Sequence, residues 1–530
     1  MTAQSAPMTA QSAPMPVRPA PSRYDTEIWP LDRTGAAPRV LLLGAVAAGL
    51  VAAVLLPDAL PGIGLVVVAA ALVAAVWPLL RVRRDRTALA FGLLAALLVA
   101  MNALRSAEWV LVLCVLLAIP LFSYALAGGR SWLELVLGGL SWPAAVERMP
   151  GWLNRGMREH RPRPTEQVVA GLRAAAIGIG VVVVFGALLA SADAVFGELA
   201  GRAAPDMSVR LLPVRVITFA LFGTATLAAG YLATHRPQWR RLAPGEPKPA
   251  RPVEWLVPIV LLDLLFTAFA AIQATVLVAD DRDALLRSTG LTYAQYARQG
   301  FFQLVMVTIG VLVVIAIAYR KLPAATGRVS ALAKGLLGML CLLSLVVVAA
   351  ALGRIWMYER AYGLTRLRVW VHAFELWLGL VIVLILVAGL IRLRPAGRPA
   401  GGRLVWLPRA VAGTGALGLL VLGAINPDGL IADSQVDRYQ RTGALDMDYL
   451  ASLSPDAVPA LDRLPEPARS CVLAGLVEQT GLNQDQPWSR WSWGRHRAEQ
   501  ILTARPVAPL SMLGPECYSV RTRATVLPGD

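Results

Sequence analysis

The chain has 530 residues, 56% of them hydrophobic and only 16% charged, with a formal net charge of +16. A soluble protein of this length has more charge and shorter apolar runs, so this composition excludes a soluble globular fold, and continuous runs of about 20 apolar residues exclude a β-barrel and predict an all-α polytopic transmembrane bundle. The basic residues lie mostly in short connections between the apolar runs, so the charge is attributed to membrane topology and no nucleic-acid partner is expected.

Residues 1–38 are rich in Ala, Pro, Ser and Gln, and the heptapeptide at 1–7 repeats at once at 8–14. A segment of this composition cannot bury a hydrophobic core and is predicted to be a disordered cytoplasmic tail. It is too long and too weakly basic to be a signal-peptide n-region, so the first span is expected to direct membrane insertion.

About eleven spans are predicted within a transmembrane bundle over residues 39–425. Their approximate bounds are 39–57, 59–80, 87–104, 107–128, 167–190, 211–234, 253–279, 301–319, 331–352, 369–391 and 404–425.

The connections that follow the even-numbered spans are basic. Their arginines and lysines lie within 81–86, 148–163, 236–251, 320–328 and 392–403. The odd-numbered connections are short, mixed or acidic, except the one after the ninth span. The positive-inside rule then predicts a multi-pass plasma-membrane protein with a cytoplasmic N-terminus and an extracytoplasmic C-terminus.

Residues 131–156 contain Trp132, Trp142 and Trp152 in a region too broken to span a bilayer. We interpret this region as an amphipathic helix at the cytoplasmic membrane interface. A loosely packed linker is the alternative.

Residues 426–530 differ in kind, because they carry ten Arg against thirteen Asp and Glu, and their apolar runs are short and interrupted by Pro. This pattern predicts a small extracytoplasmic helical domain. Two of the four cysteines, Cys471 and Cys517, lie here, whereas Cys114 and Cys341 lie in spans. Outside the cytoplasm, two cysteines in one small domain favour a disulfide.

The stretch 288–302 is a polar and aromatic segment that leads into the eighth span. Thr292 and Gln295 have the spacing of a capping box, which predicts a helix start near Tyr293. Tyr293 and Tyr296 lie on one face of that helix, and Arg298 on another. Two interpretations stay open: an ordinary capped helix start in the aromatic belt, or an external helix-end site.

Three ionisable residues lie within predicted spans, where they are costly in lipid. Asp263 lies in the seventh span, and His372 and Glu375 lie three residues apart on one face of the tenth. They are predicted either to line a polar cavity or to pair with Arg or Lys inside the bundle.

No metal site, cofactor or catalytic residue set is predicted. A single His-x-x-Glu pair gives too few metal ligands, and the chain has only four His. No nucleophile lies in a recognisable catalytic turn. An enzyme acting at the outer interface would have to use carboxylates such as Asp193, Asp280 and Asp281.

Three stretches resemble signature segments of a family of bacterial, largely actinobacterial, multi-pass membrane proteins defined by a domain of unknown function. They are Gly290–Phe301 (GLTYAQYARQGF), Ser191–Phe196 (SADAVF) and Asp448–Leu461 (DYLASLSPDAVPAL). The resemblance implies a polytopic plasma-membrane protein and provides no catalytic residue, cofactor or substrate.

Three functions follow as hypotheses. The first is a sensing or accessory envelope protein without catalytic activity, with an envelope or signalling protein as partner. The second is a transporter with a polar cavity around Asp263 and Glu375, and the third is a membrane enzyme at the outer interface.

Overall fold

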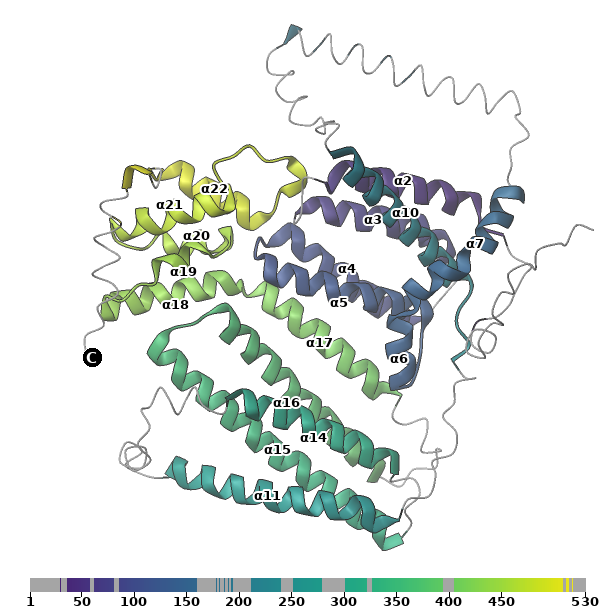
Figure 1. Cartoon of the computed structure of the whole chain (residues 1–530), viewed down its shortest axis with the longest axis vertical. Helices are drawn as coiled ribbons and strands as arrows, with labels where there is room; N and C mark the ends of the chain where they lie inside the picture. The colour runs from purple at the N-terminus through teal and green to yellow at the C-terminus, as the bar shows by residue number, and fades with distance from the viewer. Residues whose placement is uncertain are drawn as a thin grey trace, which may run out of the picture.

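The computed structural model describes residues 29, 36–57, 62–80, 85–159, 178, 181, 185, 189, 192–193, 211–239, 251–278, 301–321, 327–393, 405–508, 511–513 and 517. All regular secondary structure in these residues is helical, so the protein is all-α (Figure 1).

The helices of the bundle follow one another through the chain with short connections. They are α2 (Arg39–Leu55), α3 (Ile63–Leu80), α4 (Arg86–Leu104), α5 (Glu108–Ala127), α6 (Trp132–Gly139), α7 (Ser141–Glu159), α10 (Leu212–Thr234), α11 (Pro252–Val278), α14 (Phe301–Lys321), α15 (Gly327–Tyr362), α16 (Arg366–Leu393) and α17 (Trp406–Ala424).

Within the described residues, eight helices are long and apolar enough to cross a membrane, and α2 and α14 contain shorter apolar helices. These ten correspond to ten of the eleven predicted spans. The remaining one, at 167–190, lies almost wholly outside the described residues, as does the tail predicted at 1–38. Trp29 of that tail is described, and it is buried against Tyr231 of α10, with ring centroids 6.2 Å apart.

The helices form groups with separate hydrophobic cores (Figure 1). In one group, α11, α14, α15 and α16 share a core that includes Ile259, Leu340 and Ile382. In another, α2 packs against α3 and α10, where Gly44 meets Ala75 and Gly49 meets Phe219. A methyl group at either glycine would collide with its neighbour, so these glycines allow the close helix approach that membrane packing favours.

The segment predicted as one interfacial helix at 131–156 is divided into α6 and α7. Ser131 caps α6 by accepting from the Glu134 amide (3.3 Å). In α7, Trp152 is 2% exposed and packs edge-on against Tyr231 of α10. In contrast, Trp132 of α6 is 48% exposed. The segment is therefore partly a packed element of the bundle, and its position at a membrane interface stays a prediction.

The tail domain consists of α18 (Pro427–Thr442), α19 (Met447–Ala451), η5 (Pro455–Ala457), α20 (Val458–Leu461), α21 (Ala468–Thr480), η6 (Trp488–Arg490) and α22 (Trp493–Ala504). Its core is continuous with that of α4, α5 and α17, because one cluster joins Leu98 and Val110 to Leu450, Val458 and Leu473. The tail is thus packed onto the bundle rather than tethered to it, as Figure 1 also shows.

The opposite end of the bundle is held by a smaller polar set. Arg236, just after α10, pairs with Asp85 before α4 (3.6 Å) and donates to the carbonyl of Leu126 near the end of α5 (3.0 Å). Successive spans therefore alternate in direction, with the tail domain at one end and these residues at the other.

Candidate functional site

The tail domain contacts three connections between spans at one end of the bundle. At the α2–α3 connection, the Ile63 amide donates to the Trp491 carbonyl (2.9 Å). The α4–α5 connection is bound by Asp456. At the α15–α16 connection, the Leu364 carbonyl accepts from the Gln435 side chain (3.0 Å). This junction is the most densely bonded polar region that the structure describes, and we take it as the candidate functional site.

Asp428, in the first turn of α18, is fully buried and bound to α16 and α5. Its two oxygens accept from Arg366, with Nε–Oδ1 at 3.1 Å and Nη2–Oδ2 at 2.6 Å. The Trp109 indole donates to Oδ1 (2.9 Å) and the Ser454 amide to Oδ2 (2.9 Å). Burial alone would raise the pKa of Asp428, but Arg366 and the neutral donors hold it below its usual value. The carboxylate is therefore ionised and has fixed partners on both sides of the junction.

Asp456, in η5, is the second buried carboxyl of the junction, with 2% of its surface exposed. Its Oδ2 accepts from the backbone amides of Ser106 (2.6 Å) and Ala107 (3.0 Å) in the α4–α5 connection. Its Oδ1 has no hydrogen-bond partner within the described residues. Burial raises the pKa of Asp456 to about 6, although the Ser106 amide opposes this shift.

The turn between α17 and α18 fixes the distance between these two carboxyls. Asn426 has a left-handed backbone (φ 58°), which Asn tolerates better than most residues. Its side-chain oxygen caps α18 at the Gly429 amide (3.2 Å), and its side-chain nitrogen donates to the Asp456 carbonyl (3.1 Å). Arg105 donates to the carbonyl of Gly423 (2.9 Å), which compensates the carboxyl end of α17.

A cavity of about 360 Å³ lies between the tail and the span ends at this junction. Arg366, Arg490 and Arg495 line it, with Glu108 as the lining acid. The other polar lining residues are Ser106, Ser452, Ser454, Gln479, Thr480 and Ser492. The lining is therefore cationic and rich in hydrogen-bond donors.

The intramembrane residues predicted as a polar cluster lie elsewhere, in the group formed by α11, α14, α15 and α16. Asp263 is 7% exposed, and neither carboxyl oxygen has a partner within the described residues. Glu375 is fully buried, and its Oε1 accepts from Thr308 of α14 (3.4 Å). His372 contacts Glu359 of α15 (3.0 Å). Neither Asp263 nor Glu375 pairs with a Lys or Arg in the part of the chain that the structure describes.

The other predicted residues are largely outside the structure's described part. Thr292, Tyr293, Tyr296 and Arg298 all lie outside it. Asp193 is described and exposed, and its amide donates to the Leu189 carbonyl (2.9 Å). Among the described residues, no group of three or more His, Cys, Asp or Glu could hold a metal ion.

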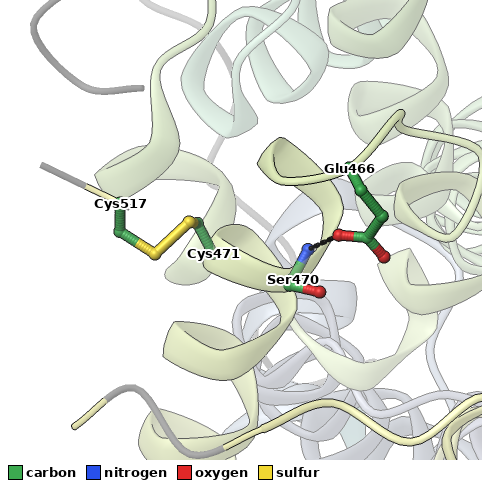
Figure 2. The surroundings of a disulfide bond; sticks show 4 residues. All are labelled: Glu466, Ser470, Cys471 and Cys517. Carbon is green, nitrogen blue, oxygen red and sulfur yellow. Dashed lines mark hydrogen bonds between the residues drawn. A yellow bond between two sulfur atoms is a disulfide. The ribbon is translucent and has the colours of Figure 1, made fainter. Parts of the chain in front are cut away.

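The structure contains a disulfide between Cys471 of α21 and Cys517 (Figure 2). Figure 2 also shows the adjacent Glu466 carboxylate accepting from the Ser470 amide (3.2 Å). On its other side, Arg469 is 2% exposed and pairs with Asp462 (2.8 Å) and with Glu466 (3.2 Å). The tail domain thus has a covalent and an ionic brace at the two sides of α21.

Sequence reasoning missed Arg366, Asp428 and Asp456 as site residues. Asp456 lies in the Asp448–Leu461 stretch that carries the family resemblance. Asp428 lies in Asn426–Gly429, a turn sequence that directly follows the last span. Turn-forming polar residues at a span end were the available signal for both.

A family model described as a domain of unknown function, DUF4153, matches residues 89–464. The matched range contains Arg366, Asp428 and Asp456. No curated protein and no solved structure matches the chain.

Proposed function

The chain belongs to the DUF4153 family, and we propose that it is a sensing or accessory protein of the plasma membrane without catalytic activity of its own. One observation carries this proposal. Asp428 and Asp456 join the tail domain to the α15–α16 and α4–α5 connections through buried hydrogen bonds. A change in the tail domain would therefore be transmitted directly to the spans.

The proposed orientation has the N-terminus in the cytoplasm and the tail domain outside. The basic connections support this orientation, because α3, α5 and α10 end together at the side opposite the tail, where Arg236 lies. The Cys471–Cys517 bond also supports it, because disulfides persist in oxidising compartments. In this arrangement the tail domain would meet an extracytoplasmic signal or a partner protein of the envelope.

Deletion of the gene in its host, followed by complementation, tests the sensing role. We expect the deletion to change the expression of envelope genes and the wild-type chain to restore it. An Asp428→Ala/Asp456→Ala chain, inserted at equal amounts in the membrane, should fail to restore it because the tail no longer couples to the spans. An exposed Asp433→Ala chain serves as the matched control. Full restoration by the double variant would contradict the proposal.

A transporter is the second candidate, and the buried carboxyls of Asp263 and Glu375 favour it. Unpaired acids inside a bundle are costly and commonly mark ion or proton pathways. In proteoliposomes with a trapped pH-sensitive dye, the wild-type chain would move protons, and Asp263→Asn or Glu375→Gln would abolish this movement. If both variants only changed thermal stability and the wild type moved no protons, this candidate would be rejected.

An enzyme at the outer interface remains the third hypothesis. Of the carboxylates it would use, Asp193 is described, and Asp280 and Asp281 lie outside the described residues.

A further inference from the structure

The cavity at the junction contains two arginines whose charge is not neutralised. Arg366 is satisfied by Asp428. Arg490, however, donates to the neutral Gln486 side chain (2.6 Å), and its Nε is buried without a partner in the described residues. The guanidinium groups of Arg490 and Arg495 therefore remain available to an anion in the cavity.

Arg495 is bonded mainly to backbone carbonyls. It donates to the Thr480 carbonyl (2.9 Å), and the ion pair it forms within the described residues, with Glu499, is 4.0 Å long. Burial lowers the pKa of Arg495, so the surroundings penalise its charge. A half-buried guanidinium of this kind is stabilised when an anion binds.

The hydroxyl groups of the cavity complement these arginines. Ser106 and Ser492 lie 2.7 Å apart, Oγ to Oγ, at the start of α22, and Ser454 and Thr480 line the same space. Phosphate groups accept several hydrogen bonds at once, and arginine forks with neutral donors are a common way to bind them. The volume of about 360 Å³ falls within the range of small-molecule sites.

Exposed tryptophans place the cavity at the level of lipid headgroups. Trp488, Trp491 and Trp493 are 47%, 39% and 51% exposed. The Trp491 carbonyl accepts from Ile63, the first residue of the candidate span α3. Arg490 also packs directly on Gly62, since a Cβ there would lie 2.6 Å from the Arg490 Cα. Tryptophans beside a span end are typical of the membrane–water interface.

We propose that the cavity lined by Arg490 and Arg495 binds the phosphate of an anionic phospholipid headgroup, with the three tryptophans inserted among neighbouring headgroups. The inference goes beyond the proposed sensing role, because a lipid bound here would hold the tail domain on the bilayer whether or not the protein transmits a signal. A soluble phosphate ester has the same binding chemistry, and the tryptophans favour the lipid.

Isothermal titration of the purified full chain in detergent tests the proposal. The probes are dihexanoyl-phosphatidylglycerol, its zwitterionic phosphatidylcholine counterpart and glycerol 3-phosphate. We expect the anionic lipid to bind at least tenfold more tightly than either of the others. Equal affinity for the two lipids, or binding of glycerol 3-phosphate alone, would overturn the assignment.

Arg490→Gln is the informative variant, because Arg490 donates to one neutral side chain and its loss leaves the fold intact. Arg495 holds the end of α21, so its substitution is less informative. Arg490→Gln should weaken phosphatidylglycerol binding about tenfold, and Arg490→Lys should restore part of the affinity. Arg497→Gln, on the exposed face of the same helix, is the matched control. Unchanged binding in Arg490→Gln, with a melting temperature equal to that of the wild type, would refute the site.

Discussion

Arg366 at the start of α16 and Asp428 at the start of α18 form a two-pronged ion pair with Nη2–Oδ2 at 2.6 Å and Nε–Oδ1 at 3.1 Å. The Asp428 side chain is wholly inaccessible to solvent, whereas that of Arg366 is 32% exposed. The pair joins the bundle to the tail domain, and removal of one partner leaves a charge without compensation on the buried side.

Arg366→Gln is therefore expected to destabilise the junction by about 3–5 kcal/mol, the cost of leaving a buried charge unpaired. Thermal unfolding of the full chain in nanodiscs measures the effect. Arg366→Gln/Asp428→Asn should recover part of the loss, because an amide oxygen can still accept from Trp109 and Ser454. The exposed pair of Arg463 and Asp433 is the matched control, and Arg463→Gln should cost about 0–1 kcal/mol. Equal losses in the two single variants would contradict the buried pair.

Acidification should stabilise the junction through Asp456. Its pKa is about 6 in the folded protein, against 3.8 for an ordinary Asp. The folded state thus holds a proton that the unfolded state has released between these values, so stability rises as the pH falls from 7 toward 4. The full effect is on the order of 2–3 kcal/mol. Asp428 has the opposite sign, since its pKa is lowered and its contribution is lost only below about pH 3.8.

Comparison with Asp456→Asn isolates this effect from the other titrating groups. The variant keeps an oxygen that can accept from Ser106 and Ala107 but carries no charge. The difference in melting temperature between wild type and variant should therefore shift in favour of the wild type between pH 7 and pH 5. A difference that stays constant over this interval would show that Asp456 does not titrate there.

The sequence predicts the spans well and the junction poorly, for a physical reason. A span must be long and apolar to cross a bilayer, so local composition reveals α3, α4 or α16 directly. The partners of Asp456, in contrast, are about 350 residues away in the chain. No local pattern records such a contact, and a single Asp after a Ser-Pro turn is typical of exposed loops. Asp263 was noticed because its neighbours are apolar, which says that it is unusual but not what surrounds it.

Loss of the Cys471–Cys517 disulfide should loosen the tail domain. The bond closes a loop with a sequence separation of 46, and such crosslinks contribute about 2–4 kcal/mol. Cys471→Ser/Cys517→Ser should lower the melting temperature and speed limited proteolysis near the C-terminal end, while the spans stay inserted. The buried Cys114 provides a control, because Cys114→Ser changes a thiol that forms no disulfide. If protein purified without reductant had four reactive thiols after denaturation, the disulfide would be absent and the predicted external location of the tail would lose that support.

Gly494 at the start of α22 is required by its contact with Asp456. A Cβ at this position would lie 1.7 Å from the Asp456 Oδ1 atom and 3.4 Å from the Ser106 Oγ atom. The Asp456 carboxyl cannot move away easily, because the amides of Ser106 and Ala107 hold it. Gly494→Ala should therefore displace α22 from the α4–α5 connection at a cost of about 1–3 kcal/mol or more.

Gly418 in α17 is the matched control, because a Cβ there meets no atom within 4 Å. Gly418→Ala should leave stability unchanged or raise it by about 0.5–1 kcal/mol through helix propensity. Adding Asp456→Ala to Gly494→Ala removes the colliding atoms, so the double variant should lose less stability than the sum of its single variants. Melting temperatures of the four chains decide the matter: strictly additive losses, or a Gly494→Ala chain as stable as Gly418→Ala, would mean that α22 does not rest on Asp456.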